Sequence, residues 1–106
     1  MMIPLENDTS NPAVGARMRL VRKLRKYSSS ATARLLDISA ASYSQYETGQ
    51  HRPPNEVMRN FCIRLDVSAD FILWGNLEAV RPQFRDMLAE ALTEQNQSQE
   101  EGKLAG

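Results

Sequence analysis

The residues best suited to chemistry in this sequence lie in one stretch, residues 28–54, SSSATARLLDISAASYSQYETGQHRPP. This stretch predicts two short helices joined by a tight turn, because Ser28 and Ser39 can each cap a helix and Gly49 can end the second one. The second helix carries hydroxyl and amide side chains that can donate and accept hydrogen bonds. A short helix of this kind fits the major groove of DNA, where base edges are recognised through such bonds.

Residues for catalysis or metal binding are sparse. The sequence contains one cysteine, Cys62, and one histidine, His51, which cannot supply the four ligands of a tetrahedral zinc site. It contains no Ser/His/Asp or Cys/His arrangement and no glycine-rich phosphate loop. We therefore expect no enzyme activity, no metal and no cofactor, and we interpret Cys62 as a small apolar core residue.

The cysteine count and the hydropathy pattern indicate in which cellular compartment the protein is expected. A single cysteine excludes an internal disulfide and suits a reducing cytoplasm. No apolar run approaches the roughly 20 residues of a membrane span, and the first residues, MMIPLENDTSNP, lack the basic-then-apolar order of a secretory signal. We expect a cytoplasmic protein with no membrane partner.

The formal net charge of zero conceals a strong asymmetry along the chain. Residues 11–64 contain ten basic and three acidic side chains, a balance of +7, whereas residues 65–106 contain eight acidic and three basic ones, a balance of −5. A basic domain followed by an acidic tail can bind a polyanion locally while the whole chain stays near neutral. The same charges could also serve only as a solvated surface with a solubilising tail.

The apolar periodicity predicts an all-α protein of one domain with additional segments. Residues 1–12 are expected to form a flexible arm and residues 13–76 a domain of five helices, near residues 14–26, 29–36, 40–48, 55–65 and 69–74. In the fifth helix Phe71, Leu73 and Trp74 are expected in the core. Residues 77–95 should contain a C-terminal amphipathic helix, and residues 96–106 a disordered tail.

Three segments, in this order and at this spacing, make residues 14–76 resemble the lambda-repressor-like family of helix-turn-helix DNA-binding domains, also called Cro-type or XRE-type. The opening pattern of the family is present as VGARMRLVR. Its turn and recognition helix are present as LLDISAASYSQYETGQHRP, and its closing pattern as LDVSADFILWGN. The resemblance implies a five-helix domain that binds double-stranded DNA.

The resemblance also assigns roles to residues. Arg22 and Glu47 match an ion pair that links the first helix to the recognition helix, a structural role. The outward positions of the recognition helix, which match the base-contacting surface, are Ala40, Ala41, Ser42, Ser44 and Gln45. The positions that match phosphate contacts are Ser28, Ser29, Ser30, Thr48, Gln50, His51 and Arg52.

Some of these positions depart from the usual pattern of the family. Residues 40–48 contain no Arg or Lys, so the bidentate contact with guanine is not possible from this helix. Gln45 can instead pair with adenine, and Ala40 and Ala41 can contact thymine methyl groups, which favours an A/T-leaning site. Ser29 replaces a glutamine and Asp37 a turn glycine, and both changes should lower affinity for DNA.

The function that these features favour is a transcriptional regulator of bacterial or phage type, most simply a repressor, that binds a palindromic operator as a homodimer. The stripe Phe84, Met87, Leu88 and Leu92 is the candidate dimer interface. A helix folded back onto its own domain would show the same stripe, so this alternative stays open. An alternative function is a protein-interaction or antitoxin-like module that binds a protein partner and has weak affinity for DNA.

Overall fold

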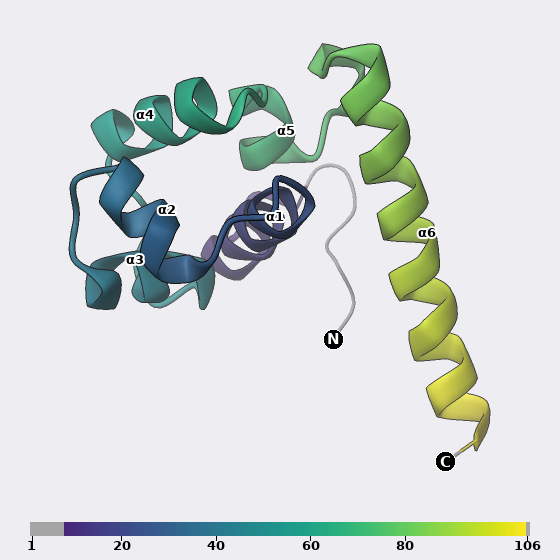
Figure 1. The fold of residues 1–106 in the computed structure, drawn as a ribbon. Coiled ribbons are helices and arrows are strands. Elements are labelled where there is room, and N and C mark those ends of the chain that lie inside the picture. The colour runs from purple at the N-terminus through teal and green to yellow at the C-terminus, as the bar shows by residue number, and fades with distance from the viewer. Residues whose placement is uncertain (1–7, 106) are drawn as a thin grey trace.

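The computed structural model describes residues 8–105, and for residues 95–105 the backbone alone. Within this range all regular secondary structure is helical, which confirms the all-α prediction. Five helices come first (Figure 1), and a 3-10 turn and a long final helix follow them: α1 (Asn11–Leu24), α2 (Ser29–Leu35), α3 (Ala40–Glu47), α4 (Asn55–Leu65), α5 (Ala69–Trp74), η1 (Leu77–Ala79) and α6 (Pro82–Ala105).

Helix α1 begins three residues earlier than the apolar pattern predicted. The hydroxyl of Ser10 accepts a hydrogen bond from the Ala13 backbone N–H, which caps the helix at Asn11. Pro12 is suited to the first turn because the N–H groups there have no intrahelical acceptor. The expected arm is therefore shorter than 12 residues, and its residues 1–7 lie outside the described part of the chain.

The turns around α2 and α3 follow from the capping serines. Ser28 accepts a hydrogen bond from Ala31 N–H at 3.0 Å, and Ser39 accepts one from Ser42 N–H at 3.0 Å. Between the two helices Asp37 adopts a positive φ of 55°, in the left-handed region that Asp tolerates better than most residues. These bonds fix the residues at which both helices start. Together with the turn at Asp37 they define how α3 follows α2.

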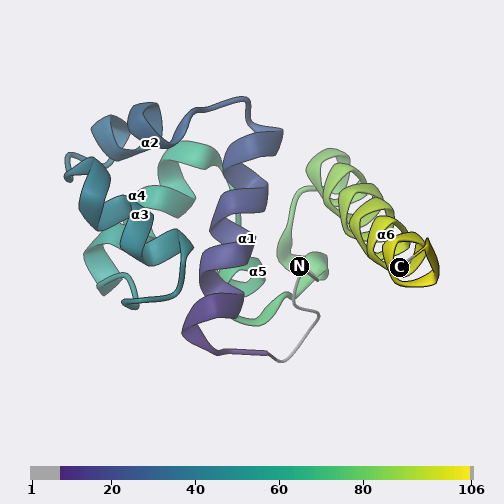
Figure 2. The same ribbon diagram turned by 90° about the horizontal axis from the view of Figure 1, so that it is seen from below.

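The core lies where the helices meet around α1. Helix α1 lies between the α2–α3 pair and α6 (Figure 2) and contacts α3, α5 and α6. It contributes Val14, Met18 and Val21, all completely buried, to a core cluster that includes side chains from or next to every other α-helix. The largest fully buried apolar members from the other helices are Tyr43, Phe61, Leu65, Phe71, Ile72 and Leu88. Trp74, the last residue of α5, was expected in this core but is 48% exposed.

Helix α6 is part of the same core. Phe84 and Leu88 are 3% and 0% exposed within the single chain, and the helix packs on α1. The prediction that these two residues form a dimer interface is therefore wrong, and for them the folded-back alternative describes the structure. Leu92 is half-buried against the same core, and Met87 is 43% exposed.

The end of α6 differs from the expected disordered tail. The helix continues through residues 96–105, beyond the packed residues of its first turns (Figure 1). Gln and Glu are good helix formers, and no proline interrupts the segment, so a helix already started on the core can propagate. No helix in residues 8–105 is long and apolar enough to cross a membrane.

Candidate nucleic-acid interface

The outward face of α3 presents small, uncharged side chains. Ala40, Ala41 and Ser44 are exposed, and Gln45 is half-buried. On the opposite face Tyr43 is completely buried. Burial raises the pKa of the Tyr43 phenol, so this side chain stays neutral and serves as the anchor of the helix. The helix thus exposes residues 40, 41, 44 and part of 45 on one side.

Ser42 is less accessible than its neighbours. Its side chain is half-buried, and its hydroxyl accepts a hydrogen bond from the Ser39 hydroxyl at 2.9 Å. Ser39 also accepts from the Ser42 backbone N–H, so the two serines form one capping unit. Of the five residues expected to face DNA bases, Ser42 is therefore the one whose side chain forms part of the N-terminal cap of α3.

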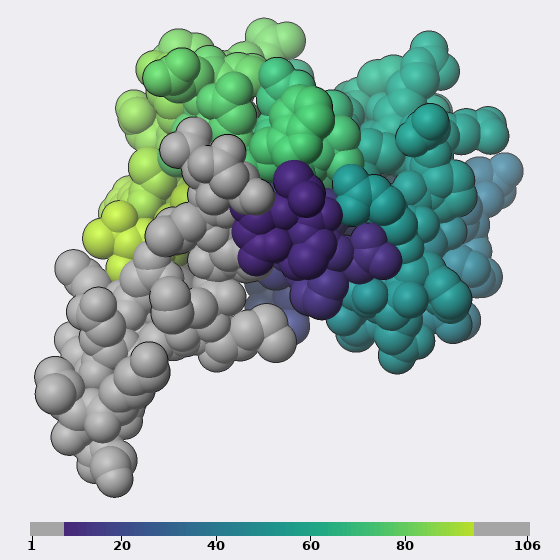
Figure 3. Space-filling view, turned by 180° about the vertical axis from the view of Figure 1, so that it is seen from behind, coloured from purple at the N-terminus to yellow at the C-terminus, as the bar shows by residue number. Residues whose placement is uncertain are grey.

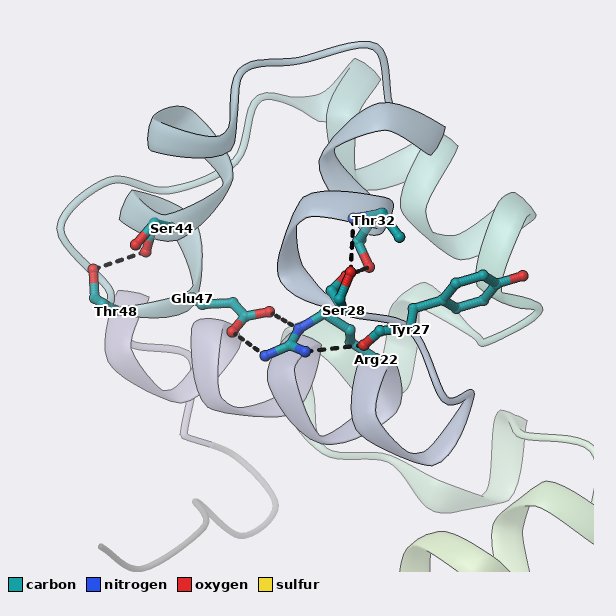
Figure 4. Close-up of polar contacts among 8 residues, drawn as sticks. Arg22, Tyr27, Ser28, Thr32, Ser44, Glu47 and Thr48 are labelled. Carbon is teal, nitrogen blue, oxygen red and sulfur yellow. Dashed lines mark hydrogen bonds and ion pairs between the residues drawn. The ribbon is translucent and has the colours of Figure 1, made fainter.

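The end of α3 is closed in a similar way. The Thr48 hydroxyl donates to the backbone carbonyl of Ser44 at 3.0 Å (Figure 4) and to that of Gln45 at 3.3 Å. This hydroxyl proton is therefore engaged within the helix end, whereas a phosphate oxygen would require a donor. Thr48 remains exposed, but its structural role is to end α3.

The start of α2 presents a second polar segment. Ser28 and Ser30 are exposed and Ser29 is half-buried. The Ser28 hydroxyl is the cap of α2, and its backbone carbonyl accepts bonds from both the N–H and the hydroxyl of Thr32, each at 3.0 Å (Figure 4). Completely buried Thr32 thereby satisfies its hydroxyl inside the helix, which explains a polar residue at a core position.

Arg22 joins the elements that carry these residues. Its Nε donates to Glu47 Oε2 at 2.6 Å and its Nη2 to Glu47 Oε1 at 3.1 Å, and its Nη1 donates to the Tyr27 carbonyl at 3.0 Å (Figure 4). The two charged side chains are only 11% and 10% exposed, and the bond to Glu47 raises the pKa of Arg22. One guanidinium therefore links α1, the residue before the α2 cap, and the end of α3.

Gly15 is a residue whose role the sequence analysis missed. A Cβ atom at this position would clash with the backbone carbonyl oxygens of Tyr46 and Glu47, so only glycine allows α1 to lie this close to α3. The available signal was a glycine inside an apolar helical pattern, which often marks a close approach of two backbones. This contact and the Arg22–Glu47 pair fix α3 from the same helix.

The loop after α3 exposes Gln50, His51 and Arg52. The Arg52 guanidinium does not extend freely: its Nη1 donates to the Thr9 carbonyl at 3.0 Å and lies 3.3 Å from Asn11 Oδ1, which also accepts from it. Of the three loop side chains, Gln50 and His51 are the ones that no described contact engages, whereas Arg52 binds the segment before α1.

Several of the basic residues counted in residues 11–64 serve the fold. Arg17 is completely buried and donates to the Ile72 carbonyl at 3.2 Å. Arg25 donates to the carbonyls of Leu65 and Asp66, each at 2.8 Å, and lies 3.6 Å from the centre of the Phe84 ring. The cations of this range that are exposed and have no described partner are Arg19, Lys23, Lys26, Arg34, Arg59 and Arg64.

Residues that would support other chemistry are not brought together. Within residues 8–94 no three His, Cys, Asp or Glu side chains are arranged to hold a metal ion. Burial raises the pKa of the Cys62 thiol to about 11, so at neutral pH it is protonated and a poor nucleophile. The exposed polar residues of α3, the start of α2 and the loop at residues 48–52 are the remaining candidates for binding.

Comparison with known proteins agrees with this architecture. The family model described as "Helix-turn-helix domain" matches residues 13–71, more than half of the chain, and the chain belongs to this family. The fold is the lambda-repressor-like fold of DNA-binding transcription regulators. A search of curated proteins found no match.

Solved structures give the same result. The P22 c2 repressor in complex with synthetic operator 9T is 28% identical, with a TM-score of 0.57, over 59% of this chain and 96% of that one. The clp gene regulator ClgR from Corynebacterium glutamicum is 18% identical, with a TM-score of 0.57, over 89% and 87%. A hypothetical transcription factor from Neisseria is 23% identical, with a TM-score of 0.57, over 83% and 97%. The last two likenesses concern the fold alone.

Proposed function

We propose that this protein is a sequence-specific, double-stranded DNA-binding transcription regulator of repressor type, which inserts α3 into the major groove. The observation that carries the proposal is the orientation of α3. Its outward face exposes Ala40, Ala41 and Ser44, while Tyr43 and the Arg22–Glu47 pair hold the opposite side on the core. A helix held rigidly with one face free is what groove recognition requires.

The polar surroundings of α3 support the proposal. The backbone around Ser28–Ser30 and the exposed side chains of Gln50 and His51 are suited to phosphate oxygens. The exposed cations of residues 11–64 add a sequence-independent attraction for DNA. The P22 c2 repressor, 28% identical over 59% of this chain, is described in complex with an operator.

The side chains of α3 favour an A/T-leaning half-site. Helix α3 contains no Arg or Lys, which are the residues that make the bidentate contact with guanine. Gln45 can pair with an adenine edge, and Ala40 and Ala41 are apolar and exposed, as contact with thymine methyl groups requires. Direct base contacts are few, so phosphate contacts and DNA shape would supply a large share of the affinity.

A dimer on a palindrome is the assembly that this affinity requires. One domain with a short, uncharged recognition helix buries little surface on DNA, whereas two copies on adjacent half-sites add their contacts. The half-sites would lie one helical turn apart, about 34 Å. As a regulator of this type the protein would act in the cytoplasm.

The test is binding to DNA measured by fluorescence anisotropy. Duplexes selected from a random pool, and the region upstream of the gene itself, are titrated with protein between 50 and 300 mM salt. Tight, sequence-dependent binding that weakens steeply with salt supports the proposal. Gln45→Ala should relax base preference, whereas Gln83→Ala, at an exposed position of α6, is the matched control and should change nothing.

Two outcomes would contradict parts of this proposal. Strictly G/C-rich selected sites would contradict the A/T-leaning half-site assigned to α3. No affinity for any duplex at 50 mM salt would favour the alternative, a protein-interaction or antitoxin-like module, for which the small uncharged face of α3 is equally suited.

A further inference from the structure

Arg52 connects two parts of the chain that are far apart in sequence. Its guanidinium Nη1 donates to the carbonyl of Thr9 at 3.0 Å and to the side-chain oxygen of Asn11 at 3.3 Å. These acceptors lie more than 40 residues before Arg52 in the chain. Both belong to the segment that enters α1, and Arg52 belongs to the loop that follows α3.

We propose that Arg52 is a positioning residue, which fastens the loop at residues 48–52 to the segment at residues 8–12. In this role its charge is directed at acceptors of its own chain, and it sets the position of the loop instead of neutralising a phosphate. The consequence for DNA binding rests on the proposed function, whereas the fastening of the loop does not.

A second contact joins the same two segments without involving Arg52. Gly49 has a φ of 82°, and a Cβ atom there would lie 2.6 Å from Pro12 Cα and 2.7 Å from Pro12 N. The loop backbone and the start of α1 are therefore in direct contact. The space-filling view shows the first described residues lying against the loop region (Figure 3).

The segment before α1 is itself ordered so that it presents acceptors. The Ser10 N–H donates to Asp8 Oδ1 at 3.1 Å, and the Ser10 hydroxyl caps α1. These bonds turn the chain at Ser10, between the two acceptors of Arg52. The hydrogen bonds from Ser10 also lower the pKa of the Asp8 carboxyl, because they favour its ionised form, which accepts them.

The position of the loop matters because it continues directly from α3. The His51 N–H donates to the Gln45 carbonyl at 3.3 Å, and Gly49 N–H donates to the Tyr46 carbonyl at 3.2 Å, so the loop is bonded back onto the helix. A loop held at both ends presents Gln50 and His51 at a fixed distance from α3. Release of Arg52 would leave the loop held by its bonds to α3 and by the Gly49–Pro12 contact, and would remove the hydrogen bonds that tie its last residue to the segment before α1.

The experiment compares Arg52→Ala, Asn11→Ala and the double variant with the wild-type protein on the DNA site that the wild type selects. Affinity is measured over a salt series, with Gln83→Ala as control. We expect Arg52→Ala to lower affinity about tenfold and Asn11→Ala to lower it less, because the bond to the Thr9 carbonyl remains. The double variant should bind within about twofold of Arg52→Ala, because Arg52→Ala already removes the bond to Asn11. The slope of log K against log salt should stay unchanged.

A phosphate contact predicts a different pattern. Loss of one such contact lowers the salt slope by about 0.9, and Asn11→Ala would leave affinity unchanged because Asn11 would play no part. Either result overturns the positioning role.

Amide hydrogen exchange tests the fastening without DNA. Arg52→Ala should raise the exchange rates of backbone amides at residues 9–13 and 49–52 at least tenfold, with no change in α4 and no change in Gln83→Ala. Unchanged rates would overturn the inference. If Arg52→Ala shows faster exchange but the wild-type protein has no affinity for DNA, the proposed function and the role of Arg52 in DNA binding are both overturned. The contact between the loop and residues 8–12 would still be established by that result.

Discussion

Arg22 and Glu47 form a two-pronged ion pair, with N···O distances of 2.6 and 3.1 Å, between the last turn of α1 and the last residue of α3. Because both side chains are about nine-tenths buried, the partner that remains after a single substitution would be a charge with little access to water. Breaking the ion pair therefore costs more free energy than the intact pair contributes to stability. This cost holds α3 against α1.

Glu47→Ala should lower the free energy of unfolding by about 3 kcal/mol, because it leaves the Arg22 guanidinium buried without its carboxylate. Equilibrium unfolding in urea measures this change. Glu56→Ala, at the exposed start of α4, is the matched control and should cost less than about 1 kcal/mol. Equal losses in the two variants would show that the ion pair does not fix α3.

Gly15→Ala should destabilise the protein although alanine favours helices. From intrinsic propensity alone the substitution would stabilise α1 by about 1 kcal/mol. The new Cβ, however, would meet the carbonyl oxygens of Tyr46 and Glu47, which are backbone atoms and cannot move independently. We expect a net loss of about 2 kcal/mol in urea unfolding. A gain in stability would mean that α1 and α3 separate at no cost.

The helix starts were predictable because capping is a local property. Ser28, Ser39 and Ser68 each precede a helix and each accept a backbone hydrogen bond within it. Ser10 does the same but was missed, because Pro12 was assigned to the arm although proline is compatible with a first helical turn. The prediction of the helix-turn-helix domain, and of the outward residues of α3, depended on such local sequence signals.

The partners of buried or charged residues were not predictable in the same way. The stripe that contains Phe84 and Leu88 indicated burial, but a periodic pattern does not show which surface covers it. Likewise the charge count treated Arg25 and Arg52 as surface cations, whereas their acceptors are the carbonyls of Leu65 and Thr9. Such acceptors are backbone atoms of distant residues, which leave no pattern in the sequence.

Phe84→Ala should destabilise the domain by about 3 kcal/mol, because it removes a buried ring that also contacts the Arg25 guanidinium. Phe84→Leu keeps part of the packing and should cost less, so that a folded variant remains for study. Met87→Ala, on the exposed side of the same helix, should stay within about 0.5 kcal/mol. Urea unfolding gives the stabilities, and sedimentation should show the same oligomeric state for Phe84→Leu as for the wild type.

Cys62 should react slowly with thiol reagents. With its pKa raised to about 11 by burial, Cys62 forms about 100-fold less thiolate at neutral pH than an unperturbed cysteine. Its reaction rate with a disulfide reagent should rise tenfold per pH unit up to pH 10, and the urea-unfolded chain should react at the ordinary rate. A rate that levels off near pH 8.5 in the folded protein would show that the thiol is not held in an apolar site.

The contact between α3 and thymine can be tested atom by atom on the DNA. Replacing thymine by uracil in the selected half-site removes one methyl group and leaves every hydrogen-bonding group in place. If Ala40 or Ala41 packs on that methyl group, affinity should fall about fourfold, from about 0.8 kcal/mol for one buried carbon. The same replacement in the flanking sequence is the control and should have no effect.

Ala40→Ser and Ala41→Ser complete this test, since each replaces an exposed apolar side chain of α3 by a polar one of similar size. In the variant whose methyl group contacts the base, the thymine and uracil duplexes should bind with nearly equal affinity, because the apolar contact is already lost. In the other variant the fourfold difference should persist. If uracil at every half-site position leaves wild-type affinity unchanged, α3 does not lie against thymine methyl groups, and its A/T preference must come from Gln45 or from DNA shape.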